Sequence, residues 1–201
     1  MKCAVNYARL KQRYEWNSDL LIGYVDKLQC LSMHEQFGYG AGRLTSFDSG
    51  AGEIIRFYID RYTQKGEPDE DYTVNAYYAM VRDLCGYGWD PEDHLWRDGV
   101  FDSYLPDRDT AAVRQNWQQR LVFIKKISFY TREMCAGMAL WLREEKGFAE
   151  TRLTRAVNPI KDGYLALAKQ YLRCSRGGDE EVRRMVADVN QKYDEMIRKV
   201  Y

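Results

Sequence analysis

The sequence contains few of the residues that interrupt helices or hold metal ions. It has 4 prolines among 201 residues, and because proline removes a helical hydrogen bond, this scarcity favours a helical protein. Five cysteines stand at wide spacings without a Cys-x-x-Cys pair, and there are two histidines. We therefore expect no metal site and no cofactor. Reduced thiols in a cytoplasmic protein are the simplest expectation.

Long hydrophobic runs are also missing. No apolar stretch approaches the roughly 18 residues of a transmembrane helix, and the N-terminus carries early charges at Lys2 and Arg9 in place of a signal-peptide core. We expect no association with a membrane. The composition of 45% apolar and 14% aromatic residues indicates a packed core, since disordered chains have fewer aromatic residues.

One short stretch occurs twice. Residues 31–45 and 140–154 align without a gap at an offset of 109 residues. In each copy an apolar run is followed by a glycine, an aromatic residue and then Arg-Leu-Thr. The identical pairs are Leu31/Leu140, Glu35/Glu144, Gly38/Gly147, Arg43/Arg152, Leu44/Leu153, Thr45/Thr154 and Tyr62/Tyr171. Because a left-handed glycine ends a helix at little steric cost, each copy predicts a helix end, a tight turn and a helix start.

These copies predict an all-α fold with two tandem helical halves related by an internal repeat. The halves would be residues 1–85 and 110–201, joined by an acidic and aromatic linker over residues 86–109 in one compact unit. Gly50 and Pro159 place a helix breaker at the same aligned position of both halves. An ancient duplication explains this match. The alternative is that any two helical hairpins share a glycine and an Arg-Leu pair.

Apolar residues at helical spacing predict the individual helices. The first covers residues 3–36, either as one helix or with a break near Asn17. The second follows the first glycine turn and extends to about Lys65. Further helices cover residues 72–85, 109–146 and 182–201.

The net charge of zero conceals an acidic middle and a basic C-terminal half. Residues 51–110 have a net charge of −8, and residues 111–201 have a net charge of +7. Such asymmetry is typical of a partner-binding surface, although the two regions could also neutralise each other within the fold. The candidate phosphate or nucleic-acid contacts of the basic half are Arg152, Arg155, Arg173, Arg176, Arg183 and Arg184.

The linker combines large aromatic side chains with carboxylates. Aromatic residues are frequent interface hot spots, and carboxylates could meet a basic partner such as the nucleic-acid channel of a nuclease. We therefore predict a partner-binding surface formed by Trp89, Asp90, Glu92, Asp93, Trp96, Asp98, Phe101 and Asp102. In the alternative interpretation, Trp89 and Trp96 cover the junction between the halves.

Residues that could carry catalysis are few. His34 stands at a helix C-terminus, where a cation is favoured, which indicates a structural role. His94 lies among linker carboxylates and is the single candidate catalytic or metal-binding centre, so we expect a protein that is not an enzyme. Arg43 and Arg152 stand at helix starts, where a cation is unfavourable. We expect them to pair with Glu35 or Glu144, or alternatively to recognise a phosphate or a partner's carboxylate.

Residues 34–44 read His-Glu-Gln-Phe-Gly-Tyr-Gly-Ala-Gly-Arg-Leu. This stretch resembles a His-acidic-x-Phe-Gly-Phe-Gly-x-x-Arg-Leu pattern in small α-helical proteins of phages and mobile elements of gut Firmicutes. The second copy departs from it, with Arg143 at the histidine position and Lys146 at the first aromatic position. The resemblance implies an accessory protein that binds a host macromolecule or its defence machinery, including CRISPR effectors. No active-site residue can be inferred from this resemblance.

The leading hypothesis is a non-catalytic macromolecule-binding protein of a phage or mobile element. Its sharpest form is an inhibitor of a bacterial nuclease or defence complex, an anti-CRISPR candidate whose partner is a protein or a nucleoprotein. The alternative is a nucleic-acid-binding protein that uses the basic C-terminal half.

Overall fold

The computed structural model describes the backbone of residues 2–63, 72–106, 110–173 and 179–200. Side chains are described for residues 20–62, 74–97, 99–106, 110–173 and 180–200. Within these ranges the chain is helical and contains no strand, which confirms the predicted all-α class. None of the described helices combines the length and the apolar character needed to cross a membrane.

The helices follow the predicted segments closely. Their bounds are α1 Lys2–Phe37, α2 Ala41–Thr63, α3 Tyr72–Gly86, α4 Pro91–His94, the 3-10 helix η1 Asp98–Ser103, α5 Ala111–Lys146, α6 Glu150–Arg173 and α7 Asp179–Val200. Of the two alternatives for the N-terminal segment, the structure has the continuous helix. Pro159 lies inside α6, and the helix continues beyond it to Arg173.

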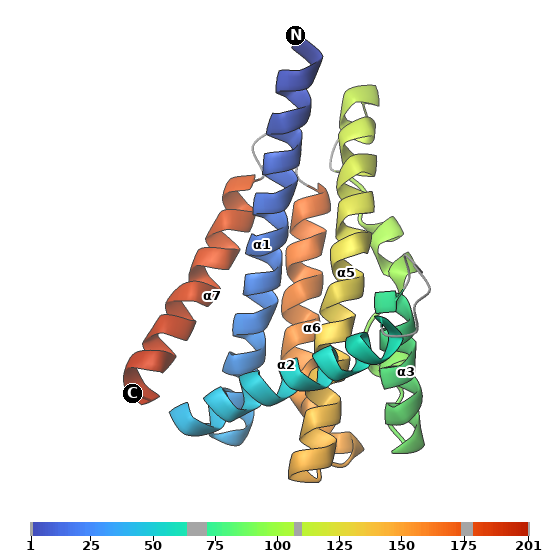
Figure 1. Ribbon diagram of the computed structural model, residues 1–201. Helices are drawn as coiled ribbons and strands as arrows, with labels where there is room; N and C mark the ends of the chain where they lie inside the picture. Colours follow the sequence, from blue (N-terminus) through green and yellow to red (C-terminus); the bar gives the residue numbers. More distant parts are fainter. Residues whose placement is uncertain (1, 64–71, 107–109, 174–178, 201) are drawn as a thin grey trace.

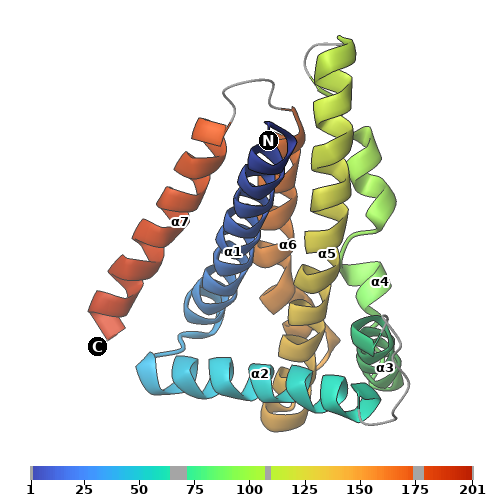
Figure 2. The same ribbon diagram turned by 45° about the horizontal axis from the view of Figure 1, so that its top comes forward.

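The long helices α1, α5, α6 and α7 run along the length of the molecule (Figure 1). Helix α2 lies across the lower ends of α1 and α5, and α3 stands beside the lower part of α5, as both ribbon views show (Figures 1 and 2). The N-terminal parts of α1 and α5 extend beyond the rest of the bundle (Figure 1).

Helices of one predicted half pack mainly against helices of the other. Helix α1 packs against α6 and α7, whereas α5 packs against α2 and α3 of the other half and against α6 of its own half. The pairing is therefore reciprocal, because the first helix of each half contacts the second and third helices of the other half. Buried apolar residues of both halves form one hydrophobic core. The halves interleave, and neither buries its apolar faces alone.

Glycines permit close approach where these helices cross. A Cβ atom added to Gly163 of α6 would lie 2.7 Å from Cδ1 of Leu28 on α1. At the other crossing, a Cβ atom added to Gly137 of α5 would lie 2.3 Å from Cγ1 of Ile55 on α2. Leu28 and Gly137 occupy aligned positions of the two halves. At each crossing a glycine therefore faces a large residue. The glycine lies on the second helix of its half at one crossing and on the first helix of its half at the other.

The two glycine turns have the predicted geometry. Gly38 and Gly147 adopt left-handed φ values of 65° and 64°. The Gly38 N–H donates to the carbonyl of His34 at 2.9 Å, and the Gly147 N–H donates to the carbonyl of Arg143 at 3.1 Å. The aromatic residues that follow, Tyr39 and Phe148, are both buried. The prediction that each glycine ends a helix is confirmed.

The bounds of the long helices also correspond at the offset of 109 residues. Helices α1 and α5 each contain 36 residues, and each is followed by three residues before the next helix begins. The second helices differ in direction, because α2 lies across the bundle while α6 runs along it (Figures 1 and 2). The correspondence therefore concerns helix bounds, turns and pairing, and it does not extend to the direction of the second helix.

Trp141 leaves no room for a side chain at position 50. A Cβ atom at Gly50 would lie 2.0 Å from Nε1 and 2.5 Å from Cδ1 of Trp141, whose buried ring packs edge-on against Phe47. We predict that Gly50→Ala lowers the free energy of unfolding by about 1–3 kcal/mol, because overpacking outweighs the gain in helix propensity. Urea denaturation measures this change.

Gly52 supplies the matched control. It lies in the same helix, and a Cβ atom there would meet nothing within 4 Å. Gly52→Ala should raise the free energy of unfolding by up to about 1 kcal/mol. Equal effects of the two substitutions would contradict the packing of Trp141 against α2.

Candidate functional site

The two glycine turns meet at one end of the molecule, the lower end in Figure 1. The ring centroids of Phe37, the last residue of α1, and Phe148, which follows the second glycine, lie 4.9 Å apart with an interplanar angle of 51°. Because Phe37 comes from the first half and Phe148 from the second, this contact joins the two copies of the repeated stretch directly.

Aligned side chains hold the two turns in the same way. Nδ1 of His34 donates to the carbonyl of Tyr39 at 2.9 Å, and Nη1 of Arg143 donates to the carbonyl of Phe148 at 3.0 Å. His34 and Arg143 are aligned at the offset of 109 residues, as are the two carbonyls. The substitution of arginine for histidine therefore keeps a donor at this position, and His34 has a structural role here.

Three exposed arginines lie over the aromatic rings of these turns. We call Arg43, Arg152 and Arg155 the arginine cluster. Cζ of Arg152 lies 4.4 Å from the ring centroid of Phe148 and 5.9 Å from that of Phe37. Cζ of Arg155 lies 5.4 Å from the same Phe37 ring. The rings hold the guanidinium groups in place by cation–π attraction.

Arg43 extends the cluster into the first half. Its Cζ lies 5.9 Å from the ring of Tyr39, the aromatic residue of the first turn. Burial raises the pKa of Tyr39, while the positive charges of Arg43 and Arg152 act in the opposite direction. Both guanidinium groups therefore act on the same phenol. The aligned arginines of the two halves, which the sequence identified separately, converge on one site.

The arginines do not pair with carboxylates, contrary to the first expectation for Arg43 and Arg152. In the part of the chain that the structure describes, none of the cluster arginines forms an ion pair. Arg155 instead donates from Nε to the side-chain oxygen of Gln36 at 2.9 Å. The pairing with Glu35 or Glu144 is thus wrong, because the aromatic rings take the place of the carboxylates as neighbours of Arg43 and Arg152.

The other predicted phosphate contacts lie elsewhere. Arg173 is at the opposite end of α6 from Arg155, about 27 Å away along the helix axis at 1.5 Å per residue. It lines a cavity of about 430 Å³ together with Lys169 and the segment Ser103–Pro106. Arg183 and Arg184 are exposed on α7, where Arg184 pairs with Glu181. Arg176 lies outside the described residues. Of the six predicted arginines, the structure gathers Arg152 and Arg155 alone around the turns.

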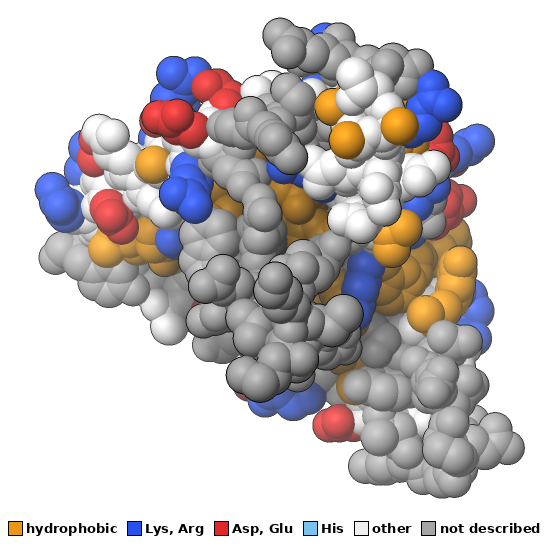
Figure 3. Space-filling view, turned by 90° about the horizontal axis from the view of Figure 1, so that it is seen from above, with side chains coloured by type: hydrophobic (Ala, Val, Ile, Leu, Met, Phe, Trp, Pro, Cys, Tyr) orange, Lys and Arg blue, Asp and Glu red, His pale blue; other side chains and the backbone are white. Residues whose placement is uncertain are grey.

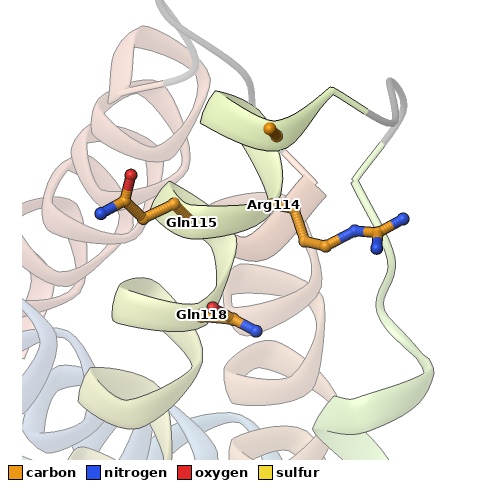
Figure 4. A pocket seen from close by; sticks show the side chains of 4 residues that line it. Arg114, Gln115 and Gln118 are labelled. Atoms are coloured by element: carbon orange, nitrogen blue, oxygen red, sulfur yellow. The ribbon is translucent and has the colours of Figure 1, made fainter.

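The described side chains at the opposite end of the bundle are arranged differently (Figure 3). Figure 3 shows that Lys and Arg side chains there are spread around the rim with acidic side chains between them. A cavity of about 350 Å³ at the start of α5 is lined by Ala111, Arg114, Gln115 and Gln118, all from one helix. Arg114 and Gln115 point to opposite sides of that helix (Figure 4), so these side chains do not converge on a ligand.

The three linker aromatic residues that were predicted to contact a partner are in the core, which corrects their predicted exposure. Trp89, Trp96 and Phe101 expose 0%, 3% and 0% of their surface, so they cannot anchor a partner in this conformation. Nε1 of Trp89 donates to Thr154 at 3.1 Å, and Nε1 of Trp96 donates to the buried Ser128 at 2.6 Å. These tryptophans tie the linker to α6 and α5, both in the second half.

Several linker carboxylates also have partners within the fold. Asp90 caps α4 by accepting the N–H of Glu92 at 2.9 Å. Glu92 accepts the Tyr77 hydroxyl at 3.3 Å and lies 3.7 Å from Nη1 of Arg132.

Two further linker acids differ in their surroundings, and a third is not described. Asp102 pairs with Lys125 at 2.9 Å. Asp93 is exposed, and the side chain of Asp98 lies outside the described residues. Part of the acidic surface is thus neutralised internally.

His94 has different neighbours from those predicted. Its ring stacks on Trp89, with centroids 5.1 Å apart, and Nδ1 lies 3.2 Å from the hydroxyl of Thr154. Nε2 lies 3.8 Å from Glu150. The Thr154 oxygen also accepts from Trp89 and is half-buried, so this group fastens the linker to α6. Within the described residues, no three His, Cys, Asp or Glu side chains are grouped so that they could hold a metal ion.

Comparison of the chain with models of protein families, with curated proteins and with solved structures finds no match. The candidate site therefore depends on the geometry of the chain itself. The signal that could have identified it is the repeated order of glycine, aromatic residue and arginine, read together with Phe37 before the first glycine.

Glu133 is a buried carboxyl group in the middle of α5. It exposes 5% of its surface, and its Oε1 atom has no hydrogen-bond partner. Because burial disfavours the charged form, the pKa of Glu133 is raised to about 7. The folded chain therefore keeps this proton up to about pH 7, whereas the unfolded chain releases it near pH 4.3.

This difference predicts a loss of stability as the pH rises. Between the two pKa values the folded state binds more protons, so the free energy of unfolding falls with pH and levels off above about pH 7. From pH 5 to pH 8 we expect a loss of about 2 kcal/mol in the wild type that Glu133→Gln removes. Urea denaturation at both pH values measures it. The exposed Glu53, changed to Gln, is the control that should keep the wild-type loss.

Proposed function

We propose that this protein is a non-catalytic binding protein that recognises an anionic macromolecule through the arginine cluster. The observation that supports this proposal is the convergence of Arg43, Arg152 and Arg155 from both halves. All three are exposed and lie over aromatic rings, and none pairs with a carboxylate among the described side chains. A surface of this kind offers planar donors that match carboxylate or phosphate groups.

The surroundings of the cluster reduce the cost of binding. An arginine side chain loses rotamer freedom when it is immobilised, and rings that already hold the guanidinium group lessen this loss. Arg152 lies over the rings of Phe148 and Phe37, and Arg155 is held by both Phe37 and Gln36. Binding therefore requires little reorganisation of these side chains.

The cluster replaces the linker as the proposed partner surface. The linker tryptophans are buried, and several of its carboxylates have internal partners, so the predicted combination of aromatic anchors and free carboxylates is not on its surface. The exposed arginines keep their donors available. The partner is therefore expected to present negative charge, whereas the acidic linker suggested a basic partner.

We further propose that the chain is an accessory protein of a phage or mobile element. The sharpest form is an inhibitor of a bacterial nuclease or defence complex, such as a CRISPR effector. The resemblance of residues 34–44 to the phage pattern supports this source. Such a complex offers two kinds of anion, the acidic surface of a protein and the nucleic acid that it holds.

We also infer that the two halves arose by duplication. Matching helix bounds, aligned donors at His34 and Arg143, and reciprocal packing of the long helices support this origin. Under this proposal Arg43 and Arg152 descend from one ancestral residue. A symmetric pair of chains would have placed the two copies of that residue near each other before fusion.

Retention of macromolecules from a bacterial lysate tests the binding function. The cluster variant carries Arg43→Glu, Arg152→Glu and Arg155→Glu, and should retain far less than the immobilised wild type because reversed charges repel an anionic partner. The control variant carries Arg56→Glu, Arg61→Glu and Lys126→Glu, which change the net charge equally at exposed positions outside the cluster. It should retain as much as the wild type.

Equal retention by the cluster variant and the wild type would contradict the proposed function. Thermal melting monitored by circular dichroism should show that both variants are folded. Nuclease treatment of the lysate then separates a nucleic-acid partner, which is lost, from a protein partner, which remains.

A further inference from the structure

The character of the arginine cluster limits the kinds of anion that fit it. Its aromatic rings lie beneath the guanidinium groups, since Tyr39 and Phe148 are buried and Phe37 is half-buried. Of the large apolar side chains that are exposed, Phe57 and Leu105 lie on α2 and after η1, whereas the ring of Tyr87 lies 5.0 Å from Cζ of Arg143, which holds the second turn. The cluster thus offers charge and guanidinium faces, with one exposed aromatic ring, that of Tyr87, beside the second turn.

Flat cationic groups of this kind suit nucleic acid with unpaired bases. Single-stranded nucleic acid binds to proteins through cationic contacts to its phosphates and through stacking of its bases on aromatic rings or guanidinium planes. Cζ of Arg152 lies 4.4 Å from the ring centroid of Phe148, and the arginine side chain is exposed on its other side to a ligand. Arg155, Phe37 and the side chain of Gln36 continue this surface along the last turn of α1.

Duplex DNA fits this end of the molecule less well. Reading the major groove requires a protruding helix or a two-stranded ribbon. At the arginine cluster α1 and α5 end, α6 begins, and α2 turns across the bundle (Figures 1 and 2). Arg43 lies at the start of α2, and Arg152 and Arg155 lie at the start of α6, so the cluster presents helix starts and the glycine turns before them.

We propose that the arginine cluster binds the phosphodiester backbone of single-stranded nucleic acid, with bases stacking on the guanidinium faces. This proposal rests on the proposed binding function and specifies its partner. Arg43 from the first half and Arg152 and Arg155 from the second contact phosphates together. Glu35 and Glu150 are exposed on the same turns, but neither pairs with the cluster, and Glu150 lies 3.8 Å from His94.

Fluorescence anisotropy with labelled single strands of about 20 nucleotides, both DNA and RNA, tests the proposal. Three phosphate contacts on a single strand give a salt slope of about −2, so the affinity should fall about 20-fold between 50 and 200 mM salt. Changing Arg43, Arg152 and Arg155 to Gln should abolish this binding. The matched control with Arg56, Arg61 and Lys126 changed to Gln should bind like the wild type.

A ring substitution separates this site from a merely charged surface. Phe37→Leu keeps an apolar side chain but removes the ring beneath Arg152 and Arg155. Since a cation–π contact at an exposed site contributes about 0.5–1 kcal/mol, the affinity should fall about 2- to 5-fold. Phe57→Leu changes an exposed phenylalanine away from the cluster and should leave the affinity unchanged.

Three results would overturn this inference. The first is that neither single strand binds at about 50 mM salt, where phosphate contacts are strong. The second is that a duplex of the same sequence binds more tightly than the strands. The third is that poly-glutamate binds as tightly as the strands. If nuclease-treated lysate still yields a partner that depends on the cluster, the broader binding function stands and the nucleic-acid assignment fails.

Discussion

The contact between the two glycine turns determines the rest of the arrangement. Left-handed φ values at Gly38 and Gly147 let two long helices end within a short distance, and Phe37 packs directly on Phe148. The next helices then begin beside these rings, so that Arg152 lies over Phe148 and Arg43 lies over the neighbouring ring of Tyr39. The two glycine turns and the helix starts that follow them are therefore sufficient to bring the arginines together on one cationic surface.

Because the two halves pack against each other reciprocally, the arginine cluster forms only when both halves are present. Because α1 is covered by α6 and α7 while α5 is covered by α2 and α3, neither half completes its core alone. Gly137 and Gly163 bring the crossing helices close enough for this exchange. The arginine cluster draws on both halves in the same way, so a separated half would lose both the core and the site.

Much of the fold could be predicted from local features. Apolar periodicity placed the helices, and the glycines at 38 and 147 marked their ends, because a left-handed glycine is a local requirement of the backbone. The burial of the linker tryptophans could not be predicted, because it depends on contacts between residues far apart in the sequence. Trp96 is buried because it meets Ser128 and Tyr164, which are far away in the sequence, and its acidic neighbours gave no sign of this.

The site shows the same division between local and long-range information. The repeat identified Arg43 and Arg152 as equivalent residues, which is a statement about the sequence. Their convergence depends on how α2 crosses α5 and how α6 crosses α1, and no local pattern encodes these crossings. Their preference for rings over carboxylates follows from the contact of Phe37 with Phe148, which joins two distant parts of the chain.

Amide hydrogen exchange, measured with and without a single strand of about 20 nucleotides at low salt, tests the central claim most directly. The account predicts slower exchange in residues 36–43 and 147–155 together, because the strand contacts both turns at once. Exchange in α3 and in the linker should stay unchanged. Protection confined to the linker, or to one turn without the other, would contradict a single binding surface built from both halves.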